Sequence, residues 1–84
     1  MKLNEDYKNR LKNRLFGLLC EYEKNREWSK YLDAILIELY GFDDSYKENA
    51  TYLHLIHNLV SCRFLSYEYF RSTIFDCMNL VDKL

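Results

Sequence analysis

Two histidines three positions apart, His54 and His57, come closest in residue type and spacing to a metal-binding site. On a helix this spacing places both imidazoles on one side, where they could share a metal ion. A zinc site needs a third and usually a fourth ligand from cysteine, histidine, aspartate or glutamate. The nearest thiol, Cys62, lies five positions beyond His57 and therefore on a different helical face. We expect two surface histidines and no metal or other cofactor.

Three cysteines are the next candidates, because a thiolate is a strong nucleophile. Cys20, Cys62 and Cys77 each lie beside apolar residues, as buried free thiols usually do, and burial disfavours the thiolate. Their odd number and the lack of a C-x-x-C spacing argue against a disulfide framework and favour a reducing compartment. The paired carboxylates of Asp43 and Asp44 are explained by a turn before a helix, and no glycine-rich phosphate loop is present. We expect no enzymatic activity.

A basic segment near the start of the chain is predicted to place four cations on the outer side of a helix: Lys8, Arg10, Lys12 and Arg14. Their i,i+4 spacing makes two adjacent ridges of charge, which could contact nucleic-acid phosphates. The alternative is a solvated face in which Glu5 pairs with Lys8 and Asp6 with Arg10. The total of 12 basic and 13 acidic side chains argues against a dedicated nucleic-acid binder, so nucleic-acid binding is the second hypothesis.

The charges are unevenly distributed along the chain. Residues 1–30 carry eight basic and five acidic side chains, whereas residues 31–60 carry one basic and five acidic side chains. Eight tyrosines are also present, and tyrosine is enriched at binding surfaces because it offers rigid, amphipathic area. We predict that an acidic, tyrosine-bearing patch docks a basic protein partner, and its residues are Asp33, Glu38, Tyr40, Asp43, Asp44, Tyr46 and Glu48. The alternative is that these rings fill the core.

The elements that would position these residues are helices. The chain lacks proline and has two glycines, too few turn-forming residues for a strand protein of 84 residues. Apolar residues recur instead at helical spacing in four segments, which are 4–22, 28–40, 46–62 and 67–84. We predict one all-α domain over residues 1–84, a compact antiparallel bundle of four helices, or of three if residues 4–40 form one long helix.

Local signals predict where the helices start. Asn4 is a candidate N-cap of the first helix. Ser45 and Glu48 have the S-x-x-E spacing of a capping box, which predicts the start of the third helix. Ser66 is the candidate cap of the fourth helix.

Other signals predict breaks and crossings. Five polar residues at 23–27 interrupt the apolar pattern and favour a turn. Gly41 is predicted to end the second helix in the left-handed conformation. Gly17, which lies inside a helical segment at a cost of roughly 1 kcal/mol, is predicted to mark a close crossing of another helix.

The leading hypothesis for function is a small, non-catalytic protein–protein interaction module or inhibitor. Residues 1–14 lack the apolar core of a signal peptide, and the longest apolar run, 15–20, is too short to span a bilayer, so we expect a cytoplasmic protein. A phage or mobile-element protein acting on a host defence or nucleic-acid-handling complex would fit the size, the charge split and the lack of catalytic motifs. A homodimer or other structural oligomer is the third hypothesis, because segment 28–40 has more apolar surface than one bundle face needs.

Overall fold

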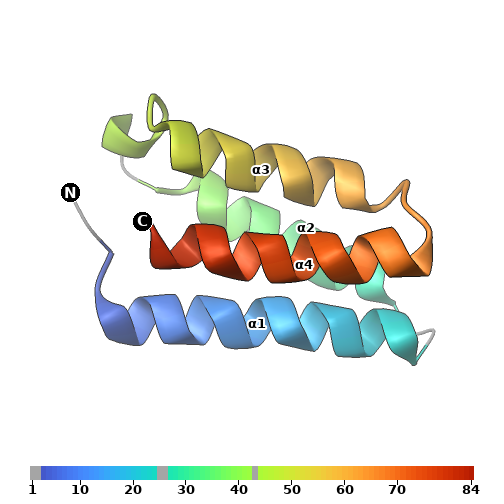
Figure 1. Cartoon of the computed structure of the whole chain (residues 1–84). Helices are drawn as coiled ribbons and strands as arrows, with labels where there is room; N and C mark the ends of the chain where they lie inside the picture. Colours follow the sequence, from blue (N-terminus) through green and yellow to red (C-terminus); the bar gives the residue numbers. More distant parts are fainter. Residues whose placement is uncertain (1–2, 25–26, 43) are drawn as a thin grey trace.

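The computed structural model describes residues 3–24, 27–42 and 44–84. Within these ranges the chain forms helices and connecting turns, without a strand (Figure 1). The helices are α1 (Glu5–Glu23), α2 (Trp28–Tyr40), α3 (Ala50–Cys62) and α4 (Tyr67–Asp82), with a short 3₁₀ helix, η1 (Asp44–Tyr46), before α3. The predicted all-α bundle of four helices is confirmed.

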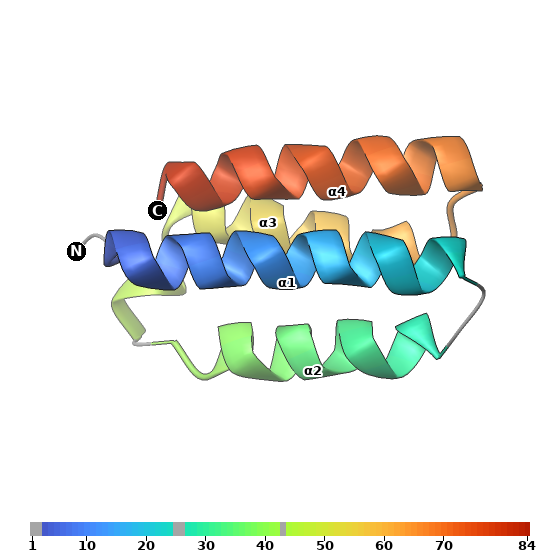
Figure 2. The ribbon, with the colours of Figure 1, turned by 90° about the horizontal axis from the view of Figure 1, so that it is seen from below.

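The first two helices are separate elements. Because α1 ends at Glu23 and α2 begins at Trp28, the alternative of one helix over residues 4–40 is wrong. Of the turn predicted for residues 23–27, residues 25 and 26 lie outside the described residues. The two helices pack side by side, and α2 runs in the direction opposite to α1 (Figure 2).

The starts of α1 and α4 lie where the sequence predicts them. The Oδ1 atom of Asn4 accepts a hydrogen bond from the backbone N–H of Asp6 at 2.7 Å, which confirms Asn4 as the N-cap. Ser66 occupies the N-cap position of α4, but its side chain makes no capping hydrogen bond among the described residues.

The start of α3 differs from the prediction. The helix begins at Ala50, and its N-cap is Asn49, four residues later than the predicted cap Ser45. The Oδ1 atom of Asn49 accepts a hydrogen bond from the N–H of Tyr52 at 3.0 Å. Residues 44–46 form η1 instead, and this turn buries the ring of Tyr46 in the core. The predicted capping box is therefore wrong, because burial of an aromatic ring by η1 sets where the helix can begin.

The two glycines behave differently. A β-carbon on Gly17 of α1 would lie 2.5 Å from the hydroxyl oxygen of Tyr31 on α2, so the predicted close crossing is confirmed. Gly41 ends α2 with φ −80° and ψ 1°, and the predicted left-handed conformation is wrong. Its N–H bonds instead to the carbonyls of Ile37 and Glu38, which closes the last turn without a positive φ.

The four helices surround one core. α1 packs against α2 and α4, and α3 packs against α4 and α2, so that α1 and α3 lie diagonally opposite (Figures 1 and 2). Each helix turns an apolar stripe inwards, as the helical periodicity predicts. The largest fully buried side chains are Phe70, Leu11, Leu15, Leu18, Leu32, Ile35, Leu39, Leu55, Leu59, Ile74, Val81 and Cys62.

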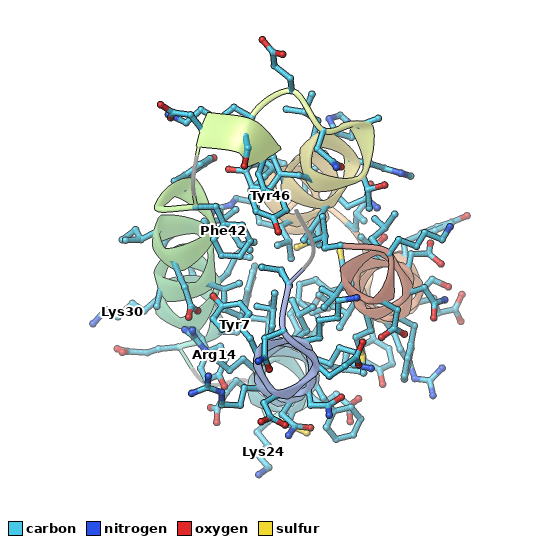
Figure 3. All side chains as sticks on the ribbon, turned by 90° about the vertical axis from the view of Figure 1, so that its left-hand side faces the viewer. Tyr7, Arg14, Lys24, Lys30, Phe42 and Tyr46 are labelled. Carbon is cyan, nitrogen blue, oxygen red and sulfur yellow. The ribbon has the colours of Figure 1, made fainter. Side chains whose placement is uncertain are left out.

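Aromatic rings close the bundle at one end. Figure 3 shows Tyr7, Phe42 and Tyr46 turned towards the space between the helices at this end. The ring centroid of Phe42 lies 5.8 Å from that of Tyr7, 5.4 Å from that of Tyr46 and 6.0 Å from that of Tyr52. The Tyr52 hydroxyl donates to the carbonyl of Leu39 at 3.0 Å, and burial raises the pKa of this phenol. Several tyrosines therefore do fill the core.

Candidate interaction surfaces

The basic segment of α1 is tied to its neighbours. Lys8, predicted on the outer side, is only 5% exposed, so that prediction is wrong. Its Nζ atom donates to the carbonyl oxygen of Asp82 at 3.0 Å and lies 3.7 Å from Oε1 of Glu5, which confirms the predicted Glu5–Lys8 pair. The reason for the inward position is the C-terminus of α4, where unpaired carbonyls and the helix dipole attract a cation.

The other three cations of this segment also have partners within the chain. The Nζ atom of Lys12 lies 2.7 Å from Oδ1 of Asp82. Arg14 forms an ion pair with Glu38 of α2, and Arg14 lies between these helices in Figure 3. The guanidinium carbon of Arg10 lies 5.7 Å from the ring centroid of Tyr7. The segment therefore connects α1 to α2 and α4.

Most carboxylates of the predicted acidic patch are paired as well. The pairs are Asp33 with Arg63 at 2.8 Å, Asp44 with Lys47 at 2.7 Å, and Glu38 with Arg14. The hydrogen bond from Lys47 lowers the pKa of Asp44. Tyr40 and Glu48 are exposed, whereas Tyr46 is 4% exposed and cannot present its ring to a partner, so its assignment to a surface patch is wrong. Asp43 lies outside the described residues.

Exposed apolar side chains gather instead along neighbouring sides of α2 and α3. On α2, Ile37 is 71% exposed and Tyr40 is 54% exposed. On α3 and just beyond its end, Leu53 is 50%, Val60 42% and Phe64 82% exposed. We call these five residues the α2–α3 face.

The Asp33–Arg63 ion pair shows how the two halves of this face are related. Asp33 precedes Ile37 by four positions and therefore lies on the same side of α2. Arg63 follows Val60 by three positions and lies on the same side of α3. Because Asp33 and Arg63 are in contact, the two apolar stripes flank one inter-helix boundary. Sequence reasoning predicted surplus apolar surface on α2 but missed its continuation on α3.

A second aromatic cluster lies at the opposite end of the bundle. The ring of Tyr22 stacks on that of Phe70 with a centroid distance of 4.0 Å and meets the ring of Trp28 at 5.1 Å. The Tyr67 hydroxyl donates to Oε1 of Glu23 at 2.9 Å and so joins the start of α4 to the end of α1. This hydrogen bond is the main cause of the raised pKa of Tyr67. The antiparallel pairing of α1 with α4 could have indicated that these residues meet.

The histidines and cysteines considered for metal binding or catalysis do not form a common site among the described residues. His54 and His57 are exposed on α3, and among the residues described, no group of three or more histidine, cysteine, aspartate or glutamate side chains is arranged to hold a metal ion. Cys62 and Cys77 are buried and Cys20 is half-buried. Burial raises the pKa of the Cys62 thiol to about 11 and that of Cys77 further, which disfavours the nucleophilic thiolate.

Across the described ranges, none of the helices combines the length and apolar character needed to cross a membrane. Comparison with known proteins adds no assignment: no family model, no curated protein and no solved structure matches this chain.

Proposed function

We propose that this chain is a small, non-catalytic protein–protein interaction module that uses the α2–α3 face to bind an amphipathic helix of another protein. The observation that carries the proposal is the exposure of Ile37, Tyr40, Leu53, Val60 and Phe64 on two neighbouring helices. An exposed apolar stripe on a soluble domain costs free energy unless a partner covers it, and such stripes mark interaction sites.

The form of the face suits a helical partner. Two antiparallel helices provide two rows of apolar side chains, and an amphipathic helix can place its own apolar residues along the boundary between them. Tyr40 supplies a ring with a polar hydroxyl at the edge, as binding surfaces often do. Phe64 offers a large apolar side chain at the far end of the same stripe.

The exposed carboxylate of Glu48 suits a partner with a basic flank. The other described carboxylates of residues 31–60 are paired within the chain: Asp33 with Arg63, Asp44 with Lys47, and Glu38 with Arg14 of α1. Glu48 is exposed just before α3, and Asp33 contributes the acidic half of the pair that crosses the boundary. Charges at the rim of an interface steer association and select against partners of like charge, although they add little affinity.

Photo-cross-linking in the source cell tests the proposal. Tyr40 and Phe16 are matched positions, because both carry aromatic rings and are 54% and 49% exposed. We expect benzoylphenylalanine at position 40 to capture a discrete second protein, and the same group at position 16 on α1 to capture none. Equal capture at both positions, or a product made of two copies of this chain, would overturn the proposal.

A further inference from the structure

An open pocket lies at the opposite edge of the bundle from the α2–α3 face, where α1 ends and α4 begins. It has a volume of about 430 Å³ and is lined by Tyr22, Glu23 and Tyr67. This volume lies within the range of small-ligand sites. The rings of Tyr22 and Tyr67 are close to parallel, with an interplanar angle of 13° and a centroid distance of 6.0 Å. The pocket therefore places a carboxylate beside two neighbouring, stacked aromatic rings.

The carboxylate is held in place and retains hydrogen-bonding capacity. Oε1 of Glu23 accepts from the Tyr67 hydroxyl at 2.9 Å, which fixes the side chain beside the rings. An ionised carboxylate offers about four lone-pair sites over its two oxygens, so one hydrogen bond leaves room for a bidentate donor.

Glu23 lies at the negative end of its helix. The C-terminal end of a helix carries a partial negative charge and favours basic side chains in its last turn. The last turn of α1 has no basic residue and ends with Glu23 itself. Two cations of the chain lie close to it: Lys24 is the C-cap residue of α1, and the charge of Arg71 on α4 acts on the Tyr67 hydroxyl. Glu68, in the first turn of α4, offsets the positive end of that helix.

We propose that the pocket formed by Tyr22, Glu23 and Tyr67 binds the guanidinium group of an arginine side chain. A guanidinium is planar, stacks on aromatic rings and donates two parallel N–H bonds to one carboxylate. A quaternary ammonium would contact the rings but has no N–H to donate to Glu23. The site is independent of the α2–α3 face and of the partner proposed for it.

The test uses N-acetyl-arginine amide as the probe and two-dimensional NMR of the full chain at constant ionic strength. The probe should cause saturable shifts in the ring signals of Tyr22 and Tyr67 and in the amide of Glu23. N-acetyl-citrulline amide has nearly the same shape without the charge, and choline has the charge without N–H donors. Neither should saturate these signals.

Variants assign the binding to the pocket. Glu23→Gln should weaken binding of the arginine probe roughly two- to fivefold, since an exposed ion pair contributes modestly. Tyr67→Ala should weaken it by a similar factor, because it removes one of the two rings and its contact with the cation. Glu68→Gln is the matched control, as Glu68 is an exposed carboxylate at the same end of the bundle, and it should leave binding unchanged. Unchanged signals from core methyl groups would establish that each variant is folded.

Several results would overturn the proposal. Citrulline or choline shifts equal to those of the arginine probe would show that charge, or hydrogen bonding to Glu23, is not recognised. An equal loss in Glu68→Gln would indicate diffuse attraction to acidic residues. Saturable shifts of the same signals with inorganic phosphate would identify an anion site at the start of α4. None of these results depends on whether a protein partner binds the α2–α3 face.

Discussion

The ammonium group of Lys8 donates a hydrogen bond to the backbone carbonyl of Asp82, 74 positions later in the chain, at 3.0 Å. This contact fixes the first turns of α1 against the last turn of α4 and satisfies a carbonyl that the helix itself leaves unpaired. Lys12 reaches the Asp82 carboxylate from the next turn of α1. The two lysines share one partner residue but differ in burial.

Replacing these lysines should have unequal effects on stability. Lys8→Met should lower the free energy of unfolding by about 1–3 kcal/mol, because it leaves a part-buried carbonyl without its donor. Lys12→Met should cost less than about 1 kcal/mol, since its ion pair with Asp82 is partly exposed to solvent and leaves no buried group unpaired. Urea unfolding with an unchanged m-value would measure both. Equal losses would contradict a special role for Lys8.

The basic segment should bind polyanions weakly. Because each of Lys8, Arg10, Lys12 and Arg14 has a partner within the chain, few of these charges are available for phosphates. We expect elution from heparin below physiological ionic strength, about 0.15 M, with little change in Arg10→Gln. Tight, salt-sensitive retention that Arg10→Gln abolishes would favour the nucleic-acid hypothesis instead.

A double-mutant cycle can test the close crossing of α1 and α2. Alanine is better than glycine inside a helix by about 1 kcal/mol, but a β-carbon on Gly17 meets the Tyr31 hydroxyl. Gly17→Ala should therefore stabilise the chain more in a Tyr31→Phe background than in the wild type, by about 0.5 kcal/mol or more. Thermal or urea unfolding of the four proteins gives this coupling. Additive effects would show that the two residues are not in contact.

The stability of the bundle should fall at alkaline pH. Burial raises the pKa of Cys62 from 9.0 to about 11, so above pH 9 the unfolded chain loses this proton while the folded chain retains it. The contribution of the Cys62 thiol to the free energy of unfolding is complete below pH 9 and is lost as the pH rises towards 11. In this window the free energy of unfolding falls by up to about 1.4 kcal/mol per pH unit.

Cys62→Ser removes the titrating thiol and should reduce the slope of unfolding free energy against pH in this window. The Cys77 thiol, whose pKa burial raises further, and the phenols of Tyr7 and Tyr52, whose pKa values are also raised, should leave a residual slope in the same direction. The readout is urea unfolding at several pH values between 8 and 11. An identical slope in the wild type and the variant would mean that the thiol is not protected in the fold.

The helices and the core could be predicted from the sequence because they depend on local periodicity. The stripe through Leu11, Leu15 and Leu18 repeats every three or four positions, and all three are buried. The role of Asn4 as N-cap was predictable because its capping hydrogen bond spans only two residues. The close crossing at Gly17 was predictable because glycine is unfavourable inside a helix, so its presence there indicates a packing constraint.

Features that depend on tertiary contacts were not predictable. From the sequence, Lys8 suits a solvent-exposed face of α1 as well as an inward one. Its inward position depends on the carbonyl of Asp82, which only the fold brings close. Ser45 has a suitable capping pattern, but the packing of Tyr46 against Phe42 favours a turn there and delays the helix to Asn49. The α2–α3 face likewise required knowledge of which helices are neighbours.

The central claim is that the α2–α3 face is the docking surface, and the dissociation constant of the cross-linked partner tests it most directly. Replacing Ile37 and Leu53 together by serine removes two exposed apolar contacts without changing the charge. We predict at least a roughly tenfold increase in the dissociation constant, because central apolar contacts carry much of the energy of an interface. Phe16→Ser, the equivalent change on α1, should leave it within about twofold. Unchanged affinity in the Ile37 and Leu53 variant, or an equal loss in Phe16→Ser, would contradict the assignment.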